Sequence, residues 1–182
     1  MTTIAGFLTD DHRHCDETFV AAEQLMAKGR WAEADQRYGE FATAIEHHFL
    51  REEELLFPAF ETATGMTTGP TLVMRKEHQQ IRQVMAALRE ALGRRDRSDC
   101  LGITETLLLL MQQHNAKEEN ILYPMSDRAL SERADNLVAE MRRRGACSSC
   151  WTAPASSRPC RSSGSWRRLS ISSPVTVCSC GV

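Results

Sequence analysis

The sequence contains an internal duplication, in which two segments align without gaps at one constant offset. Residues 48–58, HFLREEELLFP, match residues 114–124, HNAKEENILYP. The same offset relates the Asp-His pair at 11–12 to the Glu-His pair at 77–78. His12 therefore precedes the first His-x-x-x-Glu motif by the same interval as His78 precedes the second. A duplication of this kind predicts two copies of one structural unit that pack against each other.

The first 144 residues have the character of helices. Helix-forming residues dominate, proline is rare and no strand-like alternation persists. Glycine and proline often mark helix ends, and three clusters of turn residues divide the stretch, at 28–30, 64–70 and 93–96. These boundaries predict five helices, roughly over 3–28, 31–62, 70–92, 97–125 and 127–144. We therefore expect an all-α fold, an antiparallel four-helix bundle with a short fifth helix.

The composition changes abruptly after residue 146. Residues 147–182 are rich in Ser, Arg and Cys and contain no Asp, Glu or Lys. Three interpretations are open: a disordered tail, a metal knuckle built from Cys147-x-x-Cys150 and Cys178-x-Cys180, or translation in a shifted reading frame. Reading 164–181 one base earlier, with G or C at the free positions, gives an amphipathic helix and a strand, which favours the third. We divide the chain into a bundle (1–126), an additional helix (127–146) and a Ser/Arg/Cys-rich tail that is disordered or frameshifted (147–182).

Charge and hydropathy exclude several classes of protein. The formal net charge is -2, from 22 basic and 24 acidic residues, which gives no electrostatic basis for gripping nucleic acid or anionic lipid. No apolar run approaches the roughly 20 residues of a membrane helix, and the N-terminus lacks the features of a signal peptide. Only Cys15 and Cys100 precede residue 147, which fits a reducing compartment. We expect a cytoplasmic protein with no nucleic-acid or membrane partner.

Six residues of the duplication are candidate metal ligands. Residues i and i+4 share one helix face, so His48 can act with Glu52, and His114 with Glu118. In a bundle with a pseudo-twofold axis, the inward faces would direct four imidazoles and two carboxylates to one central point. The candidates are His12, His48, Glu52, His78, His114 and Glu118.

The residue types of this set indicate which metal it suits. It fits two ions, each with two histidines, bridged by Glu52 and Glu118. Imidazole and carboxylate favour iron and also accept manganese or zinc, while the absence of thiolate argues against a structural zinc site. Four protein donors per ion leave positions for an oxo or hydroxo bridge and for a small molecule such as dioxygen, nitric oxide or peroxide.

Other repeated residues are expected to support this centre. Glu53 and Glu119 point away from the ligand face, so we expect them to form salt bridges or to support the ligands. Phe57 and Tyr123 precede prolines and are expected to pack at the end of the bundle. Two further histidines match glutamine in the other half and are not expected to be ligands: His14 and His47.

The ordered motifs over about residues 5–126 resemble the hemerythrin-like (HHE cation-binding) family. They are Asp11-His12, His48-x-x-x-Glu52 followed by Leu-Phe57-Pro58, Glu77-His78, and His114-x-x-x-Glu118 followed by Leu-Tyr123-Pro124. The resemblance implies an up-down-up-down bundle around a non-haem di-iron centre. It also implies that the four histidines named above are terminal ligands and that the two glutamates bridge the irons.

One departure from the family pattern bears on function. Oxygen-carrying hemerythrins have an extra histidine one turn before the third-helix ligand, where this sequence has Met74, and the matching residue Leu8 favours apolar lining. We expect a di-iron protein that binds or senses dioxygen or nitric oxide. The alternatives are an enzyme of peroxide or nitric oxide detoxification or iron–sulfur repair, and an interaction module that has lost its metal. The sequence predicts no particular protein partner, electron donor or oligomeric state.

Overall fold

The structure, a computed structural model, describes residues 3–146, and the three interpretations of the tail concern residues outside this range. The described residues form helices, and none of them forms a strand. The helices are α1 (Ile4–Ala27), α2 (Trp31–Arg51), η1 (Glu52–Leu56), α3 (Phe57–Thr64), α4 (Pro70–Arg94), α5 (Arg97–Lys117), η2 (Glu118–Leu122), α6 (Tyr123–Ala129), η3 (Ser131–Arg133) and α7 (Ala134–Ala146). The prediction of an all-α four-helix bundle is confirmed.

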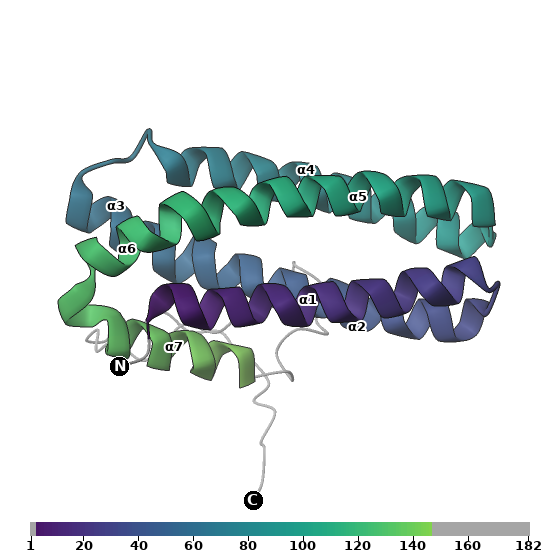
Figure 1. Cartoon of the computed structure of the whole chain (residues 1–182), viewed down its shortest axis with the longest axis horizontal. Helices are drawn as coiled ribbons and strands as arrows, with labels where there is room; N and C mark the ends of the chain where they lie inside the picture. Colours follow the sequence, from purple (N-terminus) through teal and green to yellow (C-terminus); the bar gives the residue numbers. More distant parts are fainter. Residues whose placement is uncertain (1–2, 147–182) are drawn as a thin grey trace, which may run out of the picture. The chain divides into compact units, whose positions relative to one another are not determined.

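The four long helices run antiparallel in two adjacent pairs (Figure 1). Helix α1 packs along α2, and α4 packs along α5. Local chemistry fixes the ends of these helices. The side chain of Thr3 caps α1 by accepting from the Gly6 amide at 2.9 Å, and Asp96 caps α5 by accepting from the Asp99 amide at 3.0 Å. Capping side chains satisfy amides that a helix start leaves without partners.

Helices α2 and α5 each continue through a wide turn, η1 and η2, which the sequence did not predict. In these π-helical turns the Phe57 amide donates to the Glu52 carbonyl, and the Tyr123 amide donates to the Glu118 carbonyl. Each turn precedes a proline, whose ring would clash with the carbonyl four residues earlier in a regular α-helix. The wider turn removes that clash. The chain therefore stays helical past Pro58, to Thr64.

Two apolar clusters fill the bundle, one toward each end. One is built around Phe19, Phe41 and Leu88 from the long helices. The other includes Phe57, Tyr123 and the inner face of α7, which lies alongside α1 near this end of the bundle (Figure 1). The additional helix expected over 127–144 is interrupted, because the chain leaves the helical conformation at Leu130 and restarts in α7. Among the described residues, no helix combines the length and apolarity needed to cross a membrane.

Candidate metal centre

The six candidate ligands lie between the two apolar clusters, in the middle of the bundle. Each long helix contributes one histidine, and the glutamates begin the two wide turns η1 and η2. All six side chains are buried, with at most 4% of any residue exposed. The duplication therefore brings its six polar residues into one interior site: His12, His48, Glu52, His78, His114 and Glu118.

The histidines of the first half and a glutamate of the second gather around one position. His12 Nε2 lies 3.0 Å from His48 Nε2 and 3.2 Å from Glu118 Oε2. His48 Nε2 also lies 3.3 Å from Glu52 Oε2. Atoms of His12, His48 and Glu118 lie within 4.8 Å of one another, which is close enough to share one ion.

A second position lies between the histidines of the other half. His78 Nε2 lies 3.3 Å from Glu52 Oε2, and His114 Nε2 lies 3.3 Å from Glu118 Oε2. Donor atoms of these four residues also fall within 4.8 Å of one another. Each glutamate thus lies between the two histidine pairs, as a bridging carboxylate would.

The burial of these donors shows that they fit a cation. Five polar atoms of the six candidate ligands are buried without a hydrogen-bond partner: His48 Nδ1, His78 Nε2, His114 Nε2, Glu52 Oε2 and Glu118 Oε1. A buried polar atom without a partner costs about 1–3 kcal/mol, and more when charged. All of them except His48 Nδ1 belong to residues of the second position, where metal coordination would satisfy these four together.

Each candidate histidine has a carboxylate beside its other ring nitrogen. Glu119 Oε1 lies 2.8 Å from His12 Nδ1, and Glu53 Oε1 lies 2.8 Å from His78 Nδ1. The expected pairing of Glu53 and Glu119 is therefore observed. Such a carboxylate fixes the ring orientation and leaves Nε2 to face a metal.

His48 and His114 also have a carboxylate beside Nδ1. The sequence did not predict these two carboxylates. Glu77 Oε2 lies 3.1 Å from His114 Nδ1, and Asp11 Oδ2 lies 3.6 Å from His48 Nδ1. The acid immediately before each first histidine is therefore the partner of the second histidine of the same half. The repeated Asp-His and Glu-His pairs were the available signal.

The electrostatics of the cluster favour the charged forms of His48, His78 and Glu52 despite their burial. For His114 burial is the largest influence, and its pKa is lowered. Burial alone lowers the pKa of His48, but the Glu52 carboxylate and Asp11 outweigh it and raise the pKa to about 10. Burial likewise opposes protonation of His78, whose pKa the nearby carboxylates raise to about 10. For Glu52, burial is outweighed by His48 and His78, which hold its pKa well below the usual range. The cluster thus holds protons that a metal ion would displace.

Tyr123 differs from its prediction. Its ring packs in the apolar cluster, as expected for the bundle end, but its hydroxyl enters the candidate centre. The Tyr123 Oη atom lies 2.8 Å from Glu52 Oε1, 3.0 Å from Glu118 Oε2 and 3.1 Å from His12 Nε2. Burial and the two carboxylates raise the pKa of Tyr123 well above its usual range. In the sequence, only the difference between Phe57 and Tyr123 at matched positions of the duplication indicated that this hydroxyl has a separate role.

Met74, His14 and His47 lie outside the group of candidate ligands. Met74 is 3% exposed and packs with Leu8 in the apolar cluster, as predicted for apolar lining. His14 is exposed and His47 is partly buried, and neither belongs to the groups that could hold an ion.

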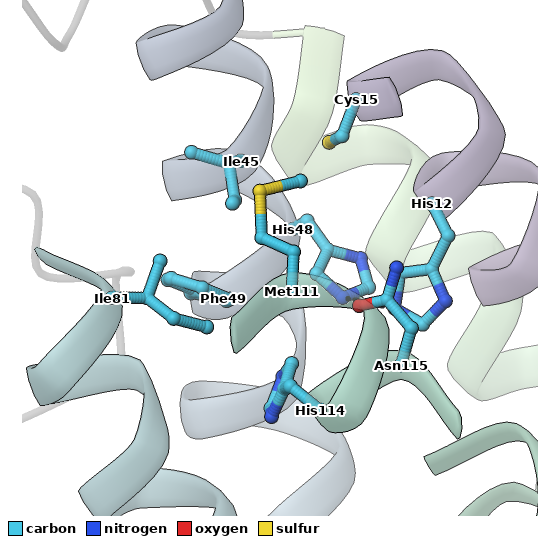
Figure 2. A pocket seen from close by; sticks show the side chains of 9 residues that line it. All are labelled: His12, Cys15, Ile45, His48, Phe49, Ile81, Met111, His114 and Asn115. Atoms are coloured by element: carbon cyan, nitrogen blue, oxygen red, sulfur yellow. Dashed lines mark hydrogen bonds between the residues drawn. The ribbon is translucent and has the colours of Figure 1, made fainter. Parts of the chain in front are cut away.

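A small cavity adjoins the candidate centre. Its volume is about 10 Å³, close to that needed for one water-sized molecule. Figure 2 shows His12, His48 and His114 on its polar side, with Met111 and Ile45 among its apolar lining. The cavity places a space of about the size of one water molecule beside three of the candidate histidines.

A family model described as the hemerythrin HHE cation binding domain matches residues 3–126. The chain belongs to the hemerythrin HHE cation-binding family. No curated protein and no solved structure gave a match. The matched range contains both halves of the duplication and all six candidate ligands, so the cation-binding description and the buried His/Glu cluster support each other.

Proposed function

We propose that this HHE protein binds two iron ions and uses the coordination positions left open to bind or sense dioxygen or nitric oxide. In this proposal His12 and His48 hold one ion, His78 and His114 hold the other, and the two glutamates bridge them. The observation that carries it is the set of buried donor atoms without partners between the two histidine pairs. Iron is proposed because imidazole and carboxylate donors without thiolate suit it.

The count of donors supports a small exogenous ligand. Two histidines and one oxygen from each bridging glutamate give four protein donors per ion, fewer than six-coordinate iron takes. An oxo or hydroxo bridge and a diatomic molecule would complete the set. The cavity of about 10 Å³ beside His12, His48 and His114 supports a ligand of this size. We also propose a cytoplasmic location, because Cys15 and Cys100 are both free thiols.

The first test is the iron content of the full chain purified after growth with iron. We expect about two irons per chain, and a large loss in His78→Ala. The matched control is His14→Gln, which copies the residue of the other half at an exposed position and should keep the iron. Circular dichroism would establish that both variants remain helical. Absence of iron and of any other metal would contradict the proposal.

The second test separates binding from catalysis. The iron-loaded protein should change its visible absorption when dioxygen or nitric oxide is added, and the change should be stoichiometric with the centre. Many turnovers of peroxide or nitric oxide in the presence of a reductant would instead indicate the enzymatic alternative. No response to either gas in a fully loaded protein would contradict a role in gas binding.

A further inference from the structure

The two candidate metal positions have different surroundings, although the duplication relates them. The ring of His78 stacks on Phe49, with ring centroids 3.9 Å apart, and on Phe57 at 5.7 Å. In the alignment of the two halves, Phe49 corresponds to Asn115, which lines the cavity beside His12 (Figure 2). The ring of Phe49 beside His78 is therefore replaced, in the other half, by the amide side chain of Asn115.

The second matched pair shows the same difference. Phe57 corresponds to Tyr123, whose ring stacks on His12 with centroids 5.7 Å apart and an angle of 29°. Phe57 stacks on His78 at the same centroid distance and an angle of 22°. The two rings therefore take equivalent places, and the hydroxyl of Tyr123 is the atom that distinguishes the two positions.

The spacing of the Tyr123 hydroxyl is that of a further ligand. Two ligands at right angles, each about 2.1 Å from one ion, have donor atoms about 3.0 Å apart. The Tyr123 Oη atom lies 2.8, 3.0 and 3.1 Å from donor atoms of Glu52, Glu118 and His12. His12 and His48 are separated by 3.0 Å in the same way. The phenol donates to Glu52 and Glu118 at these distances, and the two hydrogen bonds hold its oxygen at the spacing of a neighbouring donor of the same ion.

Resting on the proposed di-iron function, we propose that Tyr123 is a seventh ligand, which binds the ion between His12 and His48 as a phenolate. The phenol O–H bond breaks as the iron–oxygen bond forms, and the proton passes to solvent. Tyrosine oxygen is an established type of ligand for iron in proteins. Tyr123 raises the protein donors of this ion from four to five, whereas Phe57 adds none to the other. The two irons are therefore inequivalent.

The tyrosine content of the chain permits a decisive test. The sequence has two tyrosines, and the other, Tyr38, lies in the opposite apolar cluster and donates to the Met85 carbonyl at 2.5 Å. Tyr123→Phe copies the residue of the first half, and Tyr38→Phe is the matched control, because each variant loses one buried hydroxyl. Iron content and visible absorption would be measured on the full chain loaded with ferric iron, together with resonance Raman spectra.

We expect wild type to show a phenolate-to-iron charge-transfer band whose excitation enhances tyrosinate ring vibrations. Tyr38→Phe should keep this band, and Tyr123→Phe should lose it while retaining more than half of its iron. Wild type with two irons and no such band would overturn ligation by Tyr123 and leave the di-iron proposal standing. A band that survives in Tyr123→Phe would overturn it as well. Wild type without iron would overturn both proposals, which separates the two failures.

Discussion

His78 Nδ1 lies 2.8 Å from Glu53 Oε1, and the same carboxylate accepts from Arg82 Nη1 at 2.8 Å. Arg82 is held in turn by Glu46 and stacks over Phe49, with its guanidinium carbon 5.1 Å from the ring centroid. The orientation of a candidate ligand is thus fixed through a chain of charged groups that reaches the surface of the bundle.

The contacts from His78 through Glu53 to Arg82 predict that Glu53 controls metal retention without binding metal. Glu53→Ala removes the carboxylate that orients His78, and loss of such a partner typically weakens metal affinity about 10–100-fold. The measurement is the rate of iron loss to a chelator. The control is Glu54→Ala, because Glu54 lies next in sequence but pairs with Arg144 at the surface. Equal iron loss from both variants would contradict the orienting role.

The first half of the duplication has no arginine at the position that matches Arg82. In the alignment of the two halves Arg82 corresponds to Asp16, which is an acid. Burial raises the pKa of Asp16, and the nearby Glu119 adds to that shift. Glu119 is also more exposed than Glu53, with 37% against 21% of the side chain accessible. The carboxylate that orients His12 is therefore held less firmly than the one that orients His78.

Metal loading should also stabilise the fold, because the ligands come from all four long helices. A ligand at 100 times its dissociation constant adds about 2.7 kcal/mol to the free energy of unfolding. We expect a higher melting temperature for the iron-loaded chain than for the chelator-treated chain, measured by circular dichroism. The difference should shrink in His78→Ala. A melting temperature that does not depend on iron would contradict a centre shared by the four helices.

The six candidate ligands could be predicted from sequence because two periodicities coincide. The i, i+4 spacing places His48 with Glu52 on one helix face, and the constant offset of the duplication repeats that arrangement at His114 and Glu118. Both relations depend only on helix geometry and on duplication. They do not require knowledge of how side chains pack.

The hydroxyl of Tyr123 could not be placed in the same way. In a regular α-helix, a residue five positions after Glu118 lies about 140° away around the axis. The wide turn η2 bonds residue i+5 to residue i and brings Tyr123 onto the face of Glu118. Nothing in helix periodicity indicates such a turn. Arg82 was missed for a different reason, since its counterpart is an acid and the duplication gives it no support.

The buried hydroxyl of Tyr38 predicts a change in its titration. Burial raises the pKa of Tyr38 to about 12, from 10 for the free side chain, with Arg89 opposing this shift. In the Tyr123→Phe variant Tyr38 is the single tyrosine, so tyrosinate absorbance reports it alone. We expect the folded protein to show little tyrosinate at pH 10. Titration near pH 10 in the folded state would contradict the burial.

The same shift has a defined sign for stability. A raised pKa in the folded state stabilises the fold below the pKa of the unfolded chain, and the contribution is lost as pH rises from about 10 to about 12. We therefore expect the free energy of unfolding to fall over this range, and to fall less in Tyr38→Phe. Equal slopes for the two proteins would contradict the assignment of this loss to Tyr38.

The C-terminus of α4 carries a backbone strain that a substitution should relieve. Arg95 has φ of 57° and ψ of 33°, in the left-handed region. The last turn of the helix is closed by two backbone hydrogen bonds: the Arg95 amide donates to the Leu92 carbonyl, and the Asp96 amide donates to the Ala91 carbonyl. A side chain in this conformation costs about 1–2 kcal/mol, whereas glycine adopts it freely. Arg95→Gly should therefore raise the free energy of unfolding, in part offset by the greater freedom of the unfolded chain, to a net gain of about 0.5–1 kcal/mol.

The neighbouring arginine provides a control of opposite sign. Arg94 is the last residue of α4 in the helical conformation and pairs with Asp99 at the surface. Arg94→Gly should lower the free energy of unfolding by up to about 1 kcal/mol, because glycine is a poor helix former and the ion pair is lost. Urea unfolding of both variants measures the two changes. If Arg95→Gly is as destabilising as Arg94→Gly, the left-handed conformation of Arg95 is not a source of strain.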